Sequence, residues 1–265
     1  MKIAVLLAAV LCASVFAVSA RADAPPNLFD GAGVFIDNPG NLPGPWGLVT
    51  ALEENHFTWI AFHVNNGLVQ SDVPGDWIDL FRAHGIAVGG WGYEDGKPLI
   101  EAVLADLAVR RYGLDFFIAD AESPYEQTKR LHGWARSKTF VNTFRSLEPT
   151  LPAALTTYGA ATAPWVLPID YASWRDARFD LLPQAYYNQF PKSYRPDMTV
   201  AHSLRAGWPL DRVHPVIGVY RKYAAANYVP LLTGLGTRGF SVFLADQATA
   251  ADYAALEPLA AAASG

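Results

Sequence analysis

The stretch DFFIADAE, residues 115–122, places four apolar residues directly before two carboxylates. Such a run, apolar at every position, is typical of a parallel strand that helices and neighbouring strands bury on both faces. Seven further runs of the same kind occur along the chain, and their starts lie 24 to 37 residues apart, about one strand and one helix. These runs begin near Gly33, Phe57, Ile86, Pro152, Asp180, His214 and Phe240.

Amphipathic stretches separate the apolar runs and predict helices. Residues 76–85 open with the acidic Asp76 and close at Gly85, which are typical start and stop signals. Residues 125–147, 224–235 and 253–263 have a similar helical pattern. In residues 99–111 one helical face collects the large apolar side chains of Leu99, Val103, Leu104 and Leu107.

Eight strand–helix alternations without a linker favour an α/β fold of the closed (β/α)8, TIM-barrel type. We expect residues 23–265 to form this barrel as a single domain, which suits a chain of 265 residues. A doubly wound open sheet is the alternative. However, the glycine-rich dinucleotide fingerprint does not follow the first predicted strand.

The first 22 residues are predicted to be a secretory signal peptide. Lys2 precedes an apolar stretch over residues 3–18, and cleavage after Ala20 or Ala22 fits the small residues that follow. Sixteen apolar residues are short for a membrane span, so we expect no stable membrane insertion after cleavage. The protein is therefore predicted to be secreted or periplasmic. The single cysteine, Cys12, lies in this segment, so the mature chain has no thiol chemistry.

Composition excludes two function classes. The chain is 51% hydrophobic and 17% charged, the opposite of a disordered protein. Twenty basic residues against 25 acidic ones, without a basic run, exclude a nucleic-acid surface.

The aromatic share of 13%, with 8 Trp, suggests ring-stacking surfaces as well as a bulky core. We expect Trp46, Trp91, Trp165 and Trp174 near the acidic mouth of the barrel, and Trp59, Trp77, Trp134 and Trp208 in packing positions.

Polar side chains gather where the predicted strands end. In a barrel of this type the chemistry takes place at the carboxyl ends of the strands. Four carboxylates at these ends are candidate catalytic groups: Asp37, Asp120, Glu122 and Asp246. The other polar and aromatic side chains there are candidate substrate contacts: His63, Trp91, Tyr93, Tyr158, Gln184, Tyr186, Asn188 and Tyr220.

The pair Asp120 and Glu122 carries the most information about chemistry. Side chains two positions apart on a strand point the same way, with Cα atoms about 6.5 Å apart. Two carboxylates so close do not both ionise readily, so their pKa values separate. Glycosidic cleavage needs such a pair, one acid and one anion. The alternative is that Asp120 caps the next helix and Glu122 pairs with an arginine.

The remaining candidates also have structural readings. Asp37 suits a turn before Asn38, Asp246 suits a helix cap near Thr249, and His63 suits a core position. No His-x-His or His-Glu-x-x-His occurs, no Gly-x-Ser-x-Gly occurs, and no strand is followed by a phosphate-binding glycine loop. We therefore predict neither a metal site nor a cofactor.

Four short motifs, taken in order, resemble the family-25 glycoside hydrolases, which are secreted muramidases on a (β/α)8-type barrel, and related glycoside-hydrolase-like barrels. They are GVFID (33–37), GWGY (90–93), FIADAE (117–122) and TTY (156–158). The resemblance implies that Glu122 is the proton donor and that Asp120 supports the reaction centre. Asp37 and Asp246 would be further acids of the site.

The chain departs from that family at two strand ends, where it reads FHVN (62–65) and FLADQ (243–247). Chitinase-like barrels are similar in ending the fourth strand with Asp-x-Glu, and Tyr187-Asn188 loosely matches their sixth strand. Ile118 stands where their fuller motif has an aspartate.

The sequence thus predicts an exported glycosidase that cuts a polysaccharide or oligosaccharide, with cell-wall and amino-sugar glycans as the candidate substrates. Two alternatives stay open at the same mouth. One is a glycan-binding barrel without catalysis, and the other is a metal-dependent polysaccharide deacetylase or esterase.

Overall fold

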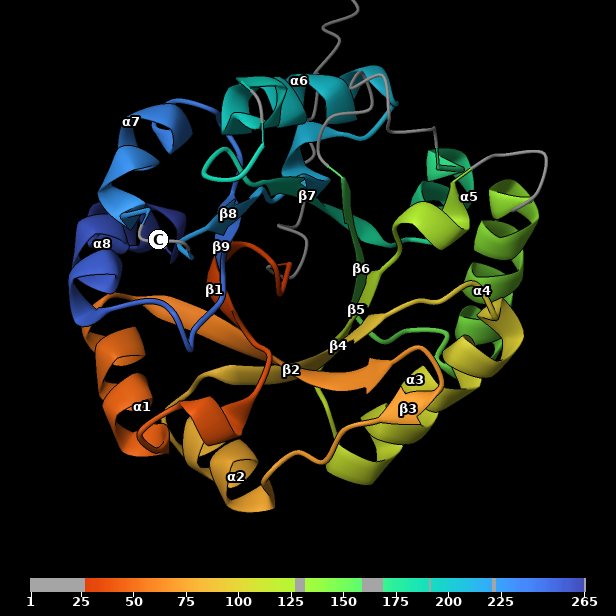
Figure 1. Cartoon of the computed structure of the whole chain (residues 1–265), viewed down its shortest axis with the longest axis horizontal. Helices are drawn as coiled ribbons and strands as arrows, with labels where there is room; N and C mark the ends of the chain where they lie inside the picture. Colours follow the sequence, from red (N-terminus) through yellow and green to blue (C-terminus); the bar gives the residue numbers. More distant parts are fainter. Residues whose placement is uncertain (1–26, 127–131, 159–168, 191, 221–222, 265) are drawn as a thin grey trace, which may run out of the picture.

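The computed structural model of the protein describes residues 27–126, 132–158, 169–190, 192–220 and 223–264. The predicted signal peptide and Trp165 lie outside the described residues. Within them, eight parallel strands close into a barrel that a ring of helices surrounds (Figure 1). The barrel strands are β1 (Gly31–Ile36), β2 (Phe57–Asn66), β4 (Ala87–Tyr93), β5 (Phe117–Asp120), β6 (Ala153–Tyr158), β7 (Asp180–Ala185), β8 (Val216–Gly218) and β9 (Gly239–Phe243).

The barrel closes because β1 pairs in parallel with both β2 and β9. Around the circumference the order is β1, β2, β4, β5, β6, β7, β8 and β9. The predicted (β/α)8 fold is therefore confirmed, and each predicted apolar run forms one strand. A short strand that was not predicted, β3 (Val69–Gln70), forms a hairpin with the end of β2.

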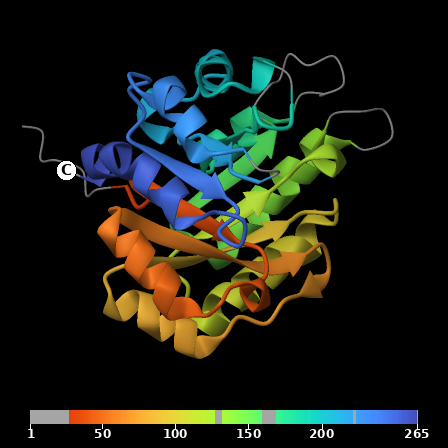
Figure 2. The same cartoon turned by 60° about the vertical axis from the view of Figure 1, so that its left-hand side comes forward.

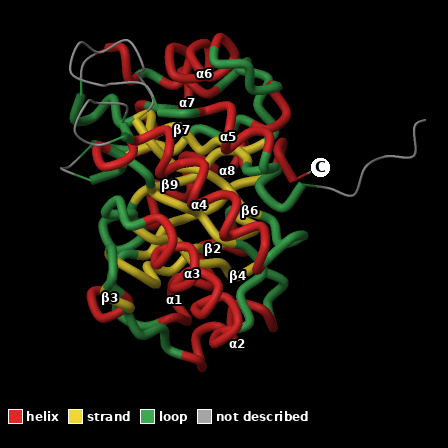
Figure 3. The backbone as a smooth tube through the Cα atoms, turned by 90° about the vertical axis from the view of Figure 1, so that its right-hand side faces the viewer, coloured by secondary structure: helices red, strands yellow, loops and turns green. Residues whose placement is uncertain are grey.

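The helices form the outer layer, as Figure 2 and Figure 3 show from two sides. They are α1 (Pro45–Glu54), α2 (Gly75–Ala83), α3 (Pro98–Tyr112), α4 (Gly133–Leu147), α5 (Tyr171–Asp176), α6 (Pro196–Arg205), α7 (Val229–Leu232) and α8 (Ala250–Ser264). Short 3-10 turns separate some of them from the strands. In the part of the chain that the structure describes, no helix is both long and apolar enough to cross a membrane.

The apolar face predicted for α3 does not pack against the barrel. Leu99, Val103 and Leu107 are 58%, 38% and 49% exposed. The side of the helix that faces inward carries Ala102, Ala105 and other buried residues. Small side chains let a helix approach its neighbours closely. The alanine face therefore packs inward, and the larger aliphatic side chains remain outside.

Aromatic rings fill the interior of the barrel. Phe29, Trp59 and Phe116 meet edge to face, with ring centroids 5.3 to 5.8 Å apart. Two glycines make room for them. A Cβ atom at Gly33 would lie 1.9 Å from the Trp59 ring, and one at Gly89 would lie 2.2 Å from the Phe116 ring. Part of the aromatic excess therefore belongs to the core.

The tryptophans divide differently from the expectation. Trp59, Trp77 and Trp208 are buried, as predicted. Trp174 was expected at the mouth but is buried on α5 against Phe140 and Phe179, because this face of α5 packs into the helical layer. Trp134 was expected to pack but is exposed on α4, and Trp46 is exposed on α1.

The end of the barrel opposite the mouth contains a closed network of charges around Asp180, the first residue of β7. Asp180 accepts hydrogen bonds from Arg212 (2.9 Å), from His214 (3.3 Å) and from Asn27. Burial alone would raise the pKa of Asp180, but the hydrogen bond and charge of His214, together with the hydrogen bonds from Asn27 and Arg212, hold it below its usual range. This end of the barrel is built for stability.

Candidate active site at the barrel mouth

The two carboxylates predicted from the sequence meet at one side of the mouth. Asp120 ends β5, and Glu122 follows two positions later. The side-chain amide of Gln184, on β7, donates to Asp120 Oδ1 at 3.1 Å and to Glu122 Oε1 at 2.8 Å. A single amide nitrogen therefore links both acids, which brings the pair and Gln184 together as one group.

The sheet holds this pair in place. The backbone nitrogen of Ala121 donates to the carbonyl of Thr156 at 3.1 Å, and that of Glu94 donates to the carbonyl of Asp120 at 3.0 Å. Pairing thus continues one residue past the end of β5 on the β6 side. Ala121 is buried, so the alternation along the strand leaves Asp120 and Glu122 facing the mouth.

The carboxyl of Asp120 is electrostatically perturbed by its surroundings. Burial of the Asp120 carboxyl raises its pKa well above the usual range, and the neighbouring charge of Glu122 raises it further. The hydrogen bond from Gln184 offsets part of this rise. The protonated form of Asp120 is therefore favoured relative to an exposed aspartate. A carboxyl pKa raised in this way is common at acid–base sites.

Three tyrosines border the pair. Burial raises the pKa values of Tyr93, Tyr158 and Tyr186, and the charge of Glu122 adds to the rise in each of them. Tyr158 also meets Ser123, with their hydroxyl oxygens 3.4 Å apart. All three phenols consequently stay neutral at physiological pH and can donate hydrogen bonds. Neutral donors around two carboxyls suit a ligand rich in hydroxyl groups.

A second polar group lies on the β1–β2 side of the mouth. His63 Nδ1 and Asp37 Oδ1 are 2.7 Å apart, and the imidazole ring stacks on Trp91 at a centroid distance of 3.9 Å. Trp91 donates from Nε1 to the carbonyl of Ile36 at 3.1 Å and is only 5% exposed. The indole ring therefore supports His63 and offers little open surface to a sugar.

Asn188 and Tyr220 form a hydrogen-bonded part of the wall next to Tyr186. Asn188 donates from Nδ2 to the carbonyl of Tyr220 at 3.2 Å and accepts at Oδ1 from the hydroxyl of Tyr228 at 3.0 Å. The Tyr220 ring packs edge to face against Tyr186 and Phe243. Asn188 thus shapes the wall, and the ring of Tyr220 forms part of it.

Asp246 lies apart from the acid pair. It follows β9, which is diametrically opposite β5 in the strand order, and it accepts at Oδ2 from Asn41 at 3.3 Å. The four predicted carboxylates therefore do not form one contacting cluster. Asp120 and Glu122 are linked, Asp37 pairs with His63, and Asp246 pairs with Asn41.

Sequence reasoning missed a fully buried acid next to the site. Glu94 directly follows β4, and burial raises its pKa well above the usual range, with the charges of Glu101 and Asp120 adding to the rise. Glu101, on α3, is also buried and accepts a hydrogen bond from Tyr125 at 2.6 Å. No pattern in the sequence distinguishes Glu94 from an exposed loop residue. Its burial becomes apparent only once the end of β4 is located in the structure.

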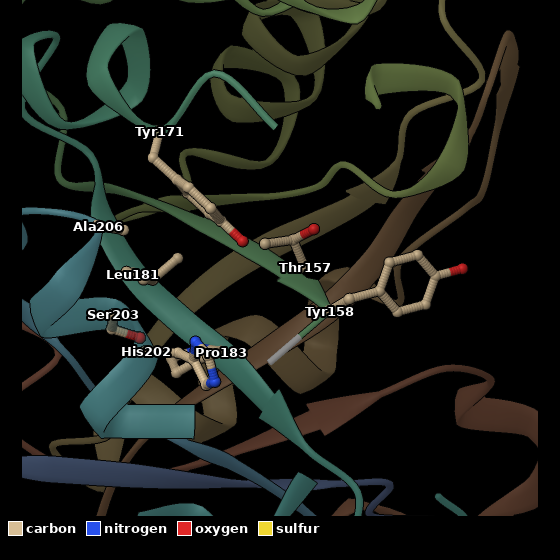
Figure 4. Close-up of a pocket in the computed structure, with 8 residues that line it drawn as sticks. All are labelled: Thr157, Tyr158, Tyr171, Leu181, Pro183, His202, Ser203 and Ala206. Atoms are coloured by element: carbon tan, nitrogen blue, oxygen red, sulfur yellow. The ribbon is translucent and has the colours of Figure 1, made fainter. Parts of the chain in front are cut away.

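Two further features bear on other kinds of site. Among the described residues no group of three or more His, Cys, Asp or Glu is arranged to hold a metal ion. A cavity of about 10 Å³ lies between β6, β7, α5 and α6 (Figure 4). Its lining consists of Thr157, Tyr158, Tyr171, Leu181, Pro183, His202, Ser203 and Ala206. This volume accommodates at most one water molecule, so the cavity is no substrate site.

No protein-family model matches the chain, and no curated protein matches it in sequence. The structure is similar to a GH18 chitinase from Pseudoalteromonas aurantia, with a TM-score of 0.65 and 13% identity over 88% of this chain and 99% of that one. It is similar to a GH18 chitinase from Cycas revoluta solved with (GlcNAc)3, with a TM-score of 0.67 and 12% identity over 89% of this chain and 100% of that one.

A third similar structure is the xylanase and alpha-amylase inhibitor protein XAIP-II from Scadoxus multiflorus. Its TM-score is 0.57 at 13% identity, over 86% of this chain and 97% of that one. At such identities the likeness establishes the barrel fold, of a type that glycoside hydrolases use, and leaves the family-25 assignment unconfirmed.

Proposed function

We propose that the protein is a glycoside hydrolase that cleaves a polysaccharide or oligosaccharide at the Asp120–Glu122 pair. The observation that carries the proposal is the amide of Gln184, which donates to both carboxyls within 3.1 Å. This contact holds two acids of unequal environment side by side at the mouth. The barrel type, shared with solved chitinases, adds support.

In the proposed reaction Glu122 donates its proton to the oxygen of the scissile bond. In the proposal Asp120 carries a proton in the free protein, because burial and the neighbouring charge of Glu122 raise its pKa well above the usual range. A substrate N–H or O–H that donates to Asp120 favours its ionised form, and the proton then moves to Glu122. As the bond to the anomeric carbon breaks, the leaving oxygen takes this proton, and Glu122 becomes the base that accepts a proton from water.

We propose an amino-sugar glycan as the substrate class. Where the sugar carries a 2-acetamido group, its N–H donates to Asp120 and its oxygen attacks the anomeric carbon, and water then opens the resulting ring. Tyr93, Tyr158 and Tyr186 supply neutral donors around this position. A similar barrel was solved with (GlcNAc)3, which agrees with this class.

Asp37 and Asp246 have a different role in the proposal. Both lie across the mouth from the acid pair, and each has its own partner, His63 or Asn41. We assign them to positioning the sugar from the far side of the mouth. We further propose that the enzyme is exported through the predicted signal peptide, which N-terminal sequencing of the mature protein tests.

The test is release of reducing ends from a panel of chitin oligosaccharides, chitosan and peptidoglycan. Glu122→Gln preserves the shape of the side chain and is expected to lower turnover by about 10²- to 10⁴-fold, the usual contribution of a general acid. Glu54→Gln, an exposed acid-to-amide change on α1, is the matched control. Unchanged turnover of Glu122→Gln on a substrate that the wild type cleaves would reject the assignment.

A glycan-binding protein without catalysis is the second candidate. The similar barrel of an inhibitor protein shows that this fold also occurs outside enzymes. Retention of the wild-type protein on one glycan of the panel, with no product after long incubation, would favour this candidate over the hydrolase.

A further inference from the structure

A cleft of about 460 Å³ lies between the segments that follow β8 and β9. Tyr220 and Tyr223 line it from the β8 segment, and Gln247 and Thr249 line it from the β9 segment. Both segments begin at the carboxyl ends of barrel strands, so the cleft lies at the same end of the barrel as the acid pair. A volume of this size suits a small-molecule ligand or a unit of a polymer.

A buried carboxylate fixes the spacing between the two sides of the cleft. Asp252, on α8, is 9% exposed and accepts at Oδ1 from the backbone nitrogen of Ala225 at 2.8 Å. At Oδ2 it accepts from the backbone nitrogen of Thr249 at 2.9 Å and from the Thr249 hydroxyl at 2.7 Å. One side chain therefore ties the β8 segment to the β9 segment, and the cleft is formed before a ligand binds.

Small side chains keep the cleft open. Ala224 and Ala226 line it from the β8 segment, Ala251 lines it from α8, and all three are exposed. A large side chain at any of these positions would occupy the space between the two sides. The three alanines therefore give a direct means of closing the cleft by substitution.

The ring of Tyr223 is held in place by other aromatic rings. It packs edge to face against Tyr187, at a centroid distance of 6.4 Å, and against Tyr228, at 5.2 Å. The hydroxyl of Tyr228 in turn donates to Asn188 Oδ1 at 3.0 Å. Since the ring is already packed, a ligand that stacks on it loses little side-chain entropy.

The chemistry of the lining favours a neutral saccharide. Of the described residues that line the cleft, Asp252 alone is charged, and both of its oxygens already accept hydrogen bonds. A phosphorylated or acidic ligand would find no counter-charge in this part of the lining. The two tyrosine rings suit the apolar face of a sugar, and the amide of Gln247 and the hydroxyl of Thr249 suit its hydroxyl groups.

The cleft adjoins the mouth through Tyr220. This residue lines the cleft, and its ring also packs against Tyr186 at a centroid distance of 5.7 Å. Around the barrel, β9 is diametrically opposite β5, which carries Asp120 (Figure 1). A glycan that has one unit at the acid pair and lies across the mouth therefore meets the cleft with a more distant unit.

We propose that this cleft is a remote sugar subsite, which holds a unit of the glycan away from the bond that is cut. The inference rests on the proposed function and deepens it, because it makes chain length a determinant of the substrate. The ring of Tyr223 stacks on the distant sugar, while Gln247 and Thr249 pair with its hydroxyl groups. Long chains occupy both the acid pair and the cleft, whereas short chains occupy the acid pair alone.

Closing the cleft tests the proposal, with chitotriose as the short substrate and chitohexaose as the long one. Ala251→Trp is expected to raise KM for chitohexaose about tenfold, the equivalent of one aromatic contact. It is expected to leave kcat and the KM for chitotriose unchanged. Ala254→Trp is the matched control, because Ala254 is exposed on the same helix and does not line the cleft. Ala226→Trp closes the cleft from the other side and is expected to act as Ala251→Trp does.

Two substitutions test the stacking role of Tyr223. Tyr223→Leu is expected to raise KM for chitohexaose about tenfold, and Tyr223→Phe is expected to retain the wild-type value, because it keeps the ring. Calorimetric titration of each variant with chitohexaose, in the Glu122→Gln background, measures binding without turnover. Circular dichroism and thermal unfolding check that each variant folds.

The outcomes separate this subsite from the proposed function. If the wild type and the two cleft-closing variants have equal KM and equal affinity for chitohexaose, the subsite is overturned and the hydrolase is not. An equal rise in Ala254→Trp would overturn the subsite as well. A protein that neither binds nor cleaves either oligosaccharide would overturn the proposed substrate class together with the subsite.

Discussion

Strand β7 joins two buried polar centres with opposite electrostatics. At its first residue, Asp180 is surrounded by Arg212, His214 and Asn27, and these partners hold its pKa below the usual range. Near its last residue, Gln184 contacts Asp120, whose pKa burial and Glu122 raise. Asp180 is surrounded by donors and positive charge, whereas Asp120 shares the amide donor of Gln184 with a second carboxylate, Glu122. The surroundings of Asp180 thus favour its ionised form, whereas those of Asp120 oppose it.

Neutralising each aspartate in turn is the most direct test of the difference between Asp180 and Asp120. Asp180→Asn is expected to lower the free energy of unfolding by about 3 kcal/mol, because it leaves Arg212 and His214 without their counter-charge in a buried setting. Asp120→Asn is expected to change stability by less than about 1 kcal/mol, since it removes a carboxylate from beside Glu122. Urea unfolding of both variants and the wild type measures the difference.

Equal losses in the two variants would contradict the distinction between the ends of the barrel. Asp211→Asn, an exposed residue near Arg212, is the control for a general effect of losing one negative charge. Its free energy of unfolding is expected to match that of the wild type.

The pH dependence of stability should separate the same two residues. Asp180 has a lowered pKa in the folded state, so its stabilisation is present above the unfolded pKa and is lost as the pH falls through the folded pKa. Asp120 has a raised pKa in the folded state. Its ionisation therefore costs stability above that pKa, and the cost disappears as the pH falls.

Unfolding midpoints across acid and neutral pH test these signs. Asp180→Asn is expected to flatten the fall in stability below about pH 4. Asp120→Asn is expected to flatten the dependence at higher pH and to leave the acid limb unchanged. A wild-type acid limb that persists in Asp180→Asn would assign it to other carboxylates.

Removing the side-chain amide of Gln184 tests the acid pair at the mouth alone. Gln184→Met keeps the length of the side chain and removes the donor to both acids, so the pKa of Asp120 is expected to rise further. Turnover is expected to fall about tenfold, the equivalent of one hydrogen bond to a charged group. Its pH profile is expected to move to higher pH. A lower turnover with an unmoved profile would show that Gln184 only packs.

The smallest effect is expected at the opposite side of the mouth. His63→Phe preserves the stack on Trp91 and removes the contact with Asp37, whose atoms are 2.7 Å apart. We expect KM to rise a few-fold, with kcat nearly unchanged, because we assign this group to positioning the sugar and not to proton transfer. A fall in kcat as large as that of Gln184→Met would place His63 in the proton-transfer machinery.

Periodicity in the sequence was sufficient for the barrel but not for every face. The eight apolar runs predict the strands because a strand buried on both sides has no polar position. The inward face of residues 99–111 was predicted incorrectly, because large aliphatic residues and small alanines form two different faces of the same helix. Sequence alone does not indicate which face packs when the gap between helix and sheet is narrow. Two-residue β3 is too short to leave a pattern.

The candidate site was predictable where it depends on strand alternation. The spacing of Asp120 and Glu122 predicts a shared direction, and the contact with Gln184 bears out that geometry. The environment of each group was not predictable, because it depends on residues distant in the chain. His63 covers the ring of Trp91, and Glu94 approaches Asp120 only through the pairing of β4 with β5.

The aromatic column inside the barrel limits how a polymer can approach. Trp59 and Phe116 occupy the space that Gly33 and Gly89 leave free, so the mouth has a solid floor. If the protein binds a glycan as proposed, the glycan chain cannot thread through the axis. It has to lie across the rim and leave on the side it entered, and its length is then not limited by the depth of the mouth. An enzyme with this architecture can act on internal bonds of a long chain as readily as on its ends.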